Sequence, residues 1–152
     1  SHDNLHKFVR SLNHFYLENK ALWQIEDSWD GFTWINANDE DNSVISFIRR
    51  GRAKGSEVIV VCNFTPVRRD SYVIGVPSGG EYVIALSSDD KRFGGASKTG
   101  TVVKARKKGF EEFKYSLELE LAPLTTIYLK KKPRPKKKTD SKKAAAKSDK
   151  AE

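Results

Sequence analysis

The stretch EVIVVCNFTPVRRDSYVIGVPSGGEYVIAL, residues 57–86, decides the fold class of this sequence. It contains three short runs rich in Val, Ile and Tyr, at 57–64, 71–76 and 81–86, and a Pro-Ser-Gly-Gly segment separates the last two. β-Branched and aromatic residues favour strands, whereas Pro, Ser and Gly favour turns. The stretch therefore predicts three consecutive β-strands with short connections.

The same alternation of strand and turn signals extends in both directions from this stretch. Five further strands are predicted, at 33–35, 43–49, 99–105, 113–121 and 125–130. The Asn- and Asp-rich segment NANDED is typical of a hairpin turn between the first two of these. About eight short strands with frequent turns indicate a mainly β fold, an antiparallel β-sandwich that we expect to span residues 23–130.

The strand predicted at 57–64 has apolar side chains on both faces. The residues on one side are Val58, Val60, Cys62 and Phe64, and those on the other are Ile59 and Val61. A two-sheet sandwich buries only one face of each sheet, so this strand needs additional cover from an N-terminal helix or a neighbouring domain. In contrast, the strand at 113–121 alternates strictly, and we expect Ser116, Glu118 and Glu120 to face water.

Residues 1–22 are predicted to form a helical segment, with the helix itself over about 4–19. Apolar residues recur at spacings of three and four, which places them on one helix face; they are Leu5, Phe8, Val9, Leu12, Phe15 and Tyr16. Asp3 is the expected N-cap and Asn19 the expected C-terminal stop. No second helix follows in the sequence, so this stripe is expected to pack on the sheet or on a domain outside this chain.

The charge of the chain is concentrated at its C-terminus. The sequence has a formal net charge of +8, from 28 Lys and Arg against 20 Asp and Glu. Eleven of the basic but only three of the acidic residues lie in 130–152, so the preceding part has 17 of each. The terminal segment has no aromatic residue and no aliphatic residue larger than Ala, so we predict a disordered Lys-rich tail at 131–152.

The location of the charge bears on the partners that the chain binds. A basic run such as KKKPRPKKK could bind nucleic acid or an anionic surface. It lacks the interleaved aromatic residues that stack on bases, and a solvated terminus is the preferred interpretation. The balanced folded part suits an uncharged polymer better than a phosphate backbone, so we do not expect nucleic acid as a partner.

The sequence shows no pattern of catalytic or metal-binding residues. Cys62 is the only cysteine and is expected to be an inert buried thiol, and His2 and His6 lack a third ligand. The acidic clusters at 39–41 and 89–90 are interpreted as turn residues, and Gly94-Gly95 lacks the strand-to-helix context of a phosphate loop. We therefore predict no catalytic residue, no metal and no cofactor. No run of about 18 apolar residues exists, which excludes a membrane span.

Three tryptophans, Trp23, Trp29 and Trp34, crowd into the link between the helix and the first strand, together with Phe32. Exposed aromatic rings bind sugars because the C–H faces of a pyranose pack on them. These tryptophans are therefore the candidate substrate-binding residues. The alternative, which we prefer from the sequence, is that the rings seal the junction between helix and sheet.

Several segments together resemble one family. They are VRSLNHFY, WDGFTWINANDEDNSVISFIRRG, VIVVCNFTPVRRDSYVIGVP, SSDDKRFGG and LELAPLTTIYL. In this order, over about residues 5–130, they are similar to the C-terminal part of bacterial 1,4-α-glucan (glycogen) branching enzymes of the α-amylase superfamily. The absence of an initiator Met also leads us to expect a piece of a longer protein.

The resemblance implies both a fold and a role. Helix 4–19 would be the last helix of a catalytic (β/α)₈ barrel, and the following sandwich would cap that barrel. The family carries out retaining transglycosylation with carboxylates at the ends of barrel strands, and none of these maps onto this sequence. We therefore expect a cytoplasmic glycosyltransferase of glycogen biosynthesis, with the barrel and glycogen as partners and no activity in this chain alone. A stand-alone glucan-binding module, or binding to nucleic acid or an anionic surface through the tail, are the alternatives.

Overall fold

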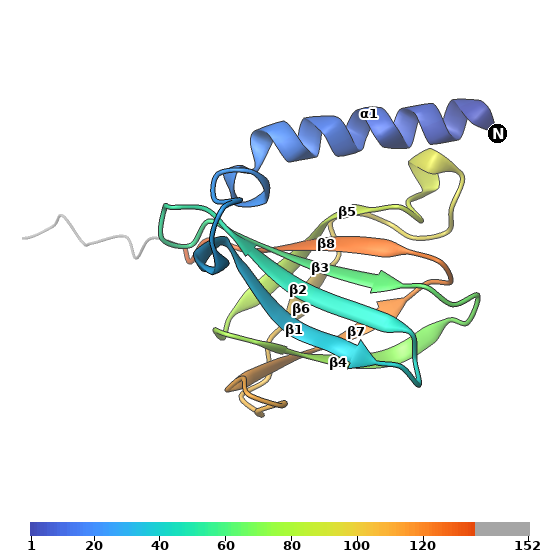
Figure 1. The fold of residues 1–152 in the computed structure, drawn as a ribbon. Coiled ribbons are helices and arrows are strands. Elements are labelled where there is room, and N and C mark those ends of the chain that lie inside the picture. Colours follow the sequence, from blue (N-terminus) through green and yellow to red (C-terminus); the bar gives the residue numbers. More distant parts are fainter. Residues whose placement is uncertain (136–152) are drawn as a thin grey trace, which may run out of the picture.

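The computed structural model describes residues 1–135 as one helix lying on a β-sandwich (Figure 1). Helix α1 spans His2–Glu18, and the short 3-10 helices are η1 (Lys20–Leu22), η2 (Trp29–Gly31) and η3 (Lys91–Phe93). The strands are β1 (Phe32–Asp39), β2 (Val44–Arg50), β3 (Glu57–Asn63), β4 (Arg69–Val76), β5 (Glu81–Ser87), β6 (Val102–Lys104), β7 (Tyr115–Leu121) and β8 (Thr126–Lys131). All eight predicted strands are confirmed.

The strands form two antiparallel sheets of unequal size. The larger sheet has the order β1-β2-β3-β8-β5-β6, and the smaller one contains only β4 and β7. The core between them consists of inward-facing aliphatic side chains from both sheets, among them Ile48, Ile59, Leu117, Leu119 and Leu129, each at most 1% exposed. The predicted mainly β, antiparallel sandwich is therefore confirmed.

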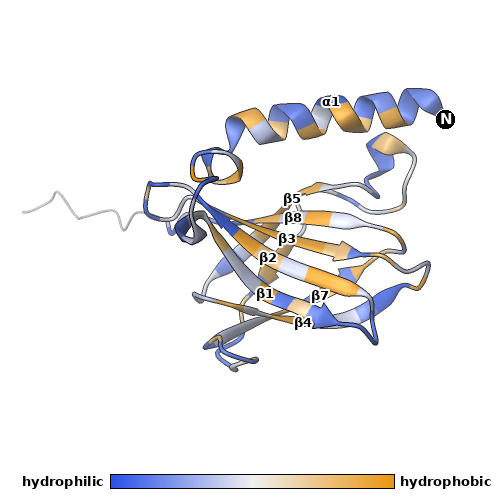
Figure 2. Ribbon diagram, in the orientation of Figure 1, coloured by the Kyte–Doolittle hydropathy of each residue, from blue (hydrophilic) through white to orange (hydrophobic). Residues whose placement is uncertain are grey.

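A second, smaller core lies on the outer face of the large sheet, under α1. Val58 and Val60 of β3 point outward and meet Phe15 of the helix, whose ring lies 5.4 Å from that of Tyr128. Ile59 and Val61 of the same strand point into the sandwich. This arrangement confirms that a strand with two apolar faces is covered by the N-terminal helix, and Figure 2 shows the apolar bands of α1 above the sheet.

The helix ends agree only in part with the sequence prediction. Asn19 is the C-cap, and its side-chain amide donates to the Phe15 carbonyl at 2.7 Å. The prediction of Asp3 as N-cap was wrong, because the helix begins at His2 and is preceded by Ser1. Asp3 instead lies in the first turn, where it forms an ion pair with Lys7 at 2.7 Å.

The basic run begins inside the sheet. Lys130 and Lys131 belong to β8 and pair with Val83 and Tyr82 of β5. The sequence prediction placed Lys130 at the end of the sandwich and Lys131 in the tail. The Lys131 ammonium donates to the Ser78 hydroxyl at 2.8 Å, so backbone pairing and a local acceptor order it. Of the predicted tail, residues 136–152 lie outside the described residues.

One side of β7 also differs from the prediction. Glu120 is exposed, but Ser116 is buried because its backbone pairs with Arg106. Within residues 1–135, no helix is both long and apolar enough to cross a membrane.

Candidate functional site

The outer face of the sheet at β1 and β2 carries a group of packed aromatic rings, the aromatic surface. Its members are Trp29, Phe32, Trp34 and Phe47. Residues two apart in a strand point to the same face, which places the rings from β1 together, and Phe47 lies opposite Trp34 in the β1–β2 register. The centroid of Phe32 lies 4.9 Å from Trp34, 5.2 Å from Phe47 and 6.0 Å from Trp29.

The segment that leads into β1 is fixed against the sheet by Arg49. The Arg49 guanidinium donates from Nη2 to the carbonyls of Leu22 and Ile25, at 3.2 and 3.1 Å. The turn at Gly31 is equally tight, because a Cβ there would lie 2.2 Å from the Ile25 carbonyl oxygen. Only glycine permits this approach. The close packing of Gly31 on Ile25 therefore fixes the backbone of η2, which carries Trp29.

The aromatic surface is open to solvent and borders a shallow hollow. Trp29 is 78% exposed and Trp34 is 45% exposed. The hollow has a volume of about 410 Å³, and its lining residues are Glu26, Asp27, Ser28, Trp29, Phe32, Trp34 and Arg49. Large exposed aromatic side chains next to polar groups are typical of an interaction site.

The structure separates the three tryptophans that the sequence grouped together. Trp29 and Trp34 meet across Phe32, whereas Trp23 lies at the end of η1 and does not line the hollow. The preferred interpretation, that the rings seal the junction, is wrong for Trp29, because most of its indole is in solvent. Sequence reasoning missed Phe47, which the β1–β2 register brings opposite Trp34, and Arg49, which bonds to the segment before β1.

The outward-facing side of α1 is the second exposed apolar feature. Leu5 and Leu17 are 61% and 68% exposed, and Val9 lies between them at 43%. Val9 and Leu17 border a furrow of about 300 Å³ that is also lined by polar and basic residues of the helix. Of the six predicted stripe residues, Phe8, Leu12 and Phe15 face the sandwich, and the other three are exposed.

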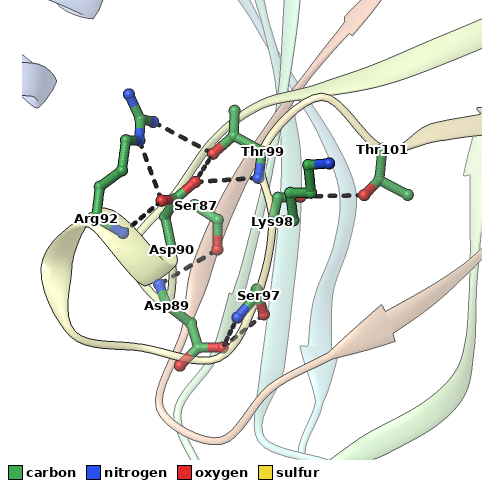
Figure 3. Close-up of polar contacts among 8 residues, drawn as sticks. All are labelled: Ser87, Asp89, Asp90, Arg92, Ser97, Lys98, Thr99 and Thr101. Atoms are coloured by element: carbon green, nitrogen blue, oxygen red, sulfur yellow. Dashed lines mark hydrogen bonds and ion pairs between the residues drawn. The ribbon is translucent and has the colours of Figure 1, made fainter.

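The loop from Ser87 to Thr101 is held by two neighbouring carboxylates (Figure 3). Asp90 accepts from the backbone and Nε of Arg92, at 2.8 and 3.0 Å, and from the backbone and hydroxyl of Thr99. Asp89 accepts from the backbone and hydroxyl of Ser97, at 3.1 and 2.5 Å. Burial disfavours ionisation of Asp90, but the donated hydrogen bonds outweigh it and hold the pKa of the carboxyl well below its ordinary value.

This loop supports the N-terminal half of α1. Phe93 packs edge-on against Phe8, with 5.3 Å between centroids. Gly94 has φ +87°, and a Cβ there would lie 2.5 Å from the Asn4 side-chain amide. The interpretation of Asp89-Asp90 as turn residues is confirmed, since both carboxylates hold the loop that carries the helix.

Comparison with known proteins places this architecture in a family. Residues 34–132 match the family described as the alpha amylase C-terminal all-beta domain. The chain belongs to this family. The alpha amylase C-terminal domain thus accounts for every strand of the sandwich, with β1 matched from its third residue.

Similarity to curated relatives covers more of the chain than the all-beta domain does. A protein from Clostridium perfringens named 1,4-alpha-glucan branching enzyme GlgB is 41% identical over 133 residues, which is 86% of this chain and 20% of that protein. Proteins of the same name from Halothermothrix orenii and Aquifex aeolicus are 38% and 40% identical, over 85% and 86% of this chain and 21% of their own length. The chain spans about a fifth of the length of the relatives it matches.

A third hollow, of about 890 Å³, lies where the edges of the two sheets separate at β6 and β7. Its lining mixes polar and apolar side chains, and it includes two ion pairs, Arg106–Glu118 at 2.6 Å and Arg68–Glu120 at 2.8 Å. Charged side chains on free strand edges discourage pairing with other chains. In this chain, the two ion pairs therefore help to protect the open edge from pairing with another chain.

The remaining candidates show no reactive arrangement. Burial raises the pKa of the Cys62 thiol, whose sulfur accepts from the Thr126 hydroxyl at 3.5 Å. The segment at 39–41 forms a turn in which Asp39 accepts from the backbone and side chain of Asn42. Within residues 1–135, no three His, Cys, Asp or Glu side chains lie close enough to hold a metal ion.

Proposed function

We propose that this chain is the C-terminal β-domain of a 1,4-α-glucan branching enzyme, in which it packs against the catalytic (β/α)₈ barrel. The observation that carries the proposal is the similarity to proteins of that name at 38 to 41% identity over about 85% of the chain. The matched region is longer than the all-beta domain, which covers residues 34–132. In this structure α1 packs on the sandwich through Phe15, so we propose that helix and sandwich form one unit in the enzyme.

The outer side of α1 is the surface through which this domain would contact the barrel. Leu5, Val9 and Leu17 repeat at spacings of four and eight, so they form one apolar stripe. They are exposed here, and fully burying such a side chain contributes about 1.5–3 kcal/mol. The barrel is the occupant that fits, because about four-fifths of the length of the relatives lies outside this chain.

In this role the domain contributes structure rather than chemistry. Retaining transglycosylation needs one carboxylate as nucleophile and another as acid/base, both free to reach the sugar. Asp89 and Asp90 are engaged by donors of their own loop, and Asp39 by Asn42 and Tyr72. The chain alone is expected to form no α-1,6 branches, because the reacting carboxylates of the family lie at the ends of barrel strands. The proposal also places the enzyme in the cytoplasm, in keeping with a single cysteine that is not in a disulfide.

The docking proposal is tested in the parent enzyme with two substitutions at equally exposed leucines. Leu17→Asp should lower the melting temperature and the branching activity on amylose, because it places a charge in the barrel interface. Leu124, also 68% exposed, lies in the β7–β8 turn, and Leu124→Asp is the matched control that should change neither.

Three results would contradict the proposal. Equal effects of both substitutions would argue against α1 as the docking face. A parent enzyme that forms no α-1,6 linkages from amylose would contradict the assignment as a branching enzyme, as would branching activity of the chain by itself.

A further inference from the structure

We infer that the furrow on the outer side of α1 receives a carboxylate of the catalytic barrel, which forms an ion pair with the guanidinium of Arg10. The ion pair rests on the proposed function, because the barrel is the body that would cover this side of the helix. It adds to the apolar stripe a second kind of contact, which depends on charge and direction.

Arg10 lies on the same face of α1 as the apolar residues of the docking surface. The residues that line the furrow follow one another at spacings of three and four, which places them on one side of the helix; they are His6, Val9, Arg10, Asn13, His14 and Leu17. Val9 directly precedes Arg10, and Leu17 lies two helical turns after it. A barrel that buries Val9 and Leu17 therefore also contacts Arg10.

Arg10 is exposed and lacks an acidic partner in the part of the chain that the structure describes. Within residues 1–135, the ion pair of α1 joins Asp3 to Lys7. The side-chain hydrogen bonds of the helix and its C-cap are donated by Tyr16 and Asn19. No Asp or Glu of residues 1–135 lines the furrow. The Arg10 guanidinium is therefore available to a group from outside.

Burial of this surface requires a partner for the charge. Arginine is always protonated in proteins, and a buried charge without a partner is strongly destabilising. A carboxylate compensates the charge and accepts two parallel hydrogen bonds from the planar guanidinium. His6 and His14 favour the same choice, since a histidine is neutral or positive and never negative. A backbone carbonyl would accept a hydrogen bond but leave the charge uncompensated.

The ion pair is tested by thermal inactivation of the parent enzyme, measured as the rate at which branching activity on amylose is lost at a fixed temperature. Arg10→Met removes the charge and keeps an unbranched side chain. It should be inactivated at least about tenfold faster than the unmodified enzyme, because the barrel carboxylate stays buried without a partner.

Lys7→Met is the matched control. Lys7 lies on the same helix but outside the furrow, and it pairs with Asp3 at an exposed position, so its removal should leave the inactivation rate unchanged. The 152-residue chain separates docking from folding. Arg10 has no acidic partner among residues 1–135, so Arg10→Met should leave the urea midpoint of this chain unchanged.

A double-mutant cycle identifies the carboxylate. Barrel-surface Asp residues are replaced by Asn, and Glu residues by Gln, in both the unmodified and the Arg10→Met enzyme. One of these substitutions should accelerate inactivation in the unmodified enzyme and have no further effect beside Arg10→Met. A barrel surface in which no carboxylate couples to Arg10 would overturn the inference.

Two other results would also overturn it: inactivation of Arg10→Met no faster than that of Lys7→Met, or a lower urea midpoint of the isolated chain. If the Arg10→Met enzyme does not accumulate, Arg10→Lys decides, because it keeps the charge and loses the planar fork. Faster inactivation than Lys7→Met then supports the pair, and an equal rate overturns it. The proposed function fails separately, because an effect of Leu17→Asp without one of Arg10→Met would keep α1 as the docking face and remove only the ion pair.

Discussion

The two faces of the six-stranded sheet are made of similar residues but are covered differently. The inner face packs against β4 and β7, and its aliphatic side chains are almost completely buried. The outer face is covered by α1 over β3, β8 and β5, while the segment with η1 and η2 lies against the β1–β2 end and leaves Trp29 and Trp34 exposed. The inner face therefore contributes stability and leaves no exposed surface for a partner. The outer side leaves two exposed surfaces, the aromatic surface and the open side of α1.

The largest expected loss of stability comes from a substitution in the inner face of the sheet. Leu117 is fully buried between the sheets, so Leu117→Ala removes packed methyl groups and leaves a cavity. The free energy of unfolding should fall by about 2–5 kcal/mol. Urea denaturation followed by circular dichroism measures it. A loss below about 1 kcal/mol would mean that the inner core is not the main source of stability.

A smaller effect is expected in the loop that joins the outer layer to the sheet. Asp90→Asn should lower the free energy of unfolding at pH 7 by about 1–3 kcal/mol, because hydrogen bonds to a buried carboxylate are weakened. The folded pKa of Asp90 lies below its ordinary value of 3.8. The stabilisation is therefore complete above that value and is lost as the pH falls towards the folded pKa.

The pH dependence supplies the control for this prediction. The difference between the unmodified chain and Asp90→Asn should shrink when urea denaturation is repeated near pH 3. Asp70→Asn should have almost no effect at either pH, because Asp70 pairs with Arg68 at an exposed position. A difference that stays constant with pH would show that the Asp90 charge is not responsible.

The smallest effect is expected on the open side of α1. Leu17→Ala in this chain should change the free energy of unfolding by less than about 0.5 kcal/mol, because the side chain is 68% exposed. Urea denaturation again measures it. A loss comparable to that of Leu117→Ala would show that the stripe already packs within the chain, and would remove the argument for a docking face.

Local patterns explain how much of the fold was predictable. Runs of β-branched or aromatic residues between turn residues predicted the strands. The two apolar faces of 57–64 correctly predicted a covering layer. The pairing was not predictable, because β8 enters between β3 and β5 and so joins segments distant in sequence. The division into six and two strands follows from that insertion.

The candidate site shows the same limit. Trp29 and Trp34 lie together on the aromatic surface, whereas Trp23, which the sequence places near them, lies apart. Phe47 joins the surface through strand register, and Arg49 through bonds to the segment before β1. Those relations depend on three-dimensional packing and have no counterpart in a spacing rule.

The packing of α1 has a consequence for the order of folding during synthesis. The aromatic partners of Phe8 and Phe15 are Phe93 and Tyr128. The helix is therefore translated long before the residues on which it packs. An isolated helix of 17 residues is only marginally stable in water, and contacts of such long sequence separation form slowly. The side of α1 that faces the sandwich therefore stays uncovered until β8 leaves the ribosome, so the helix and the sheet pack only once the last strand of the domain has been made.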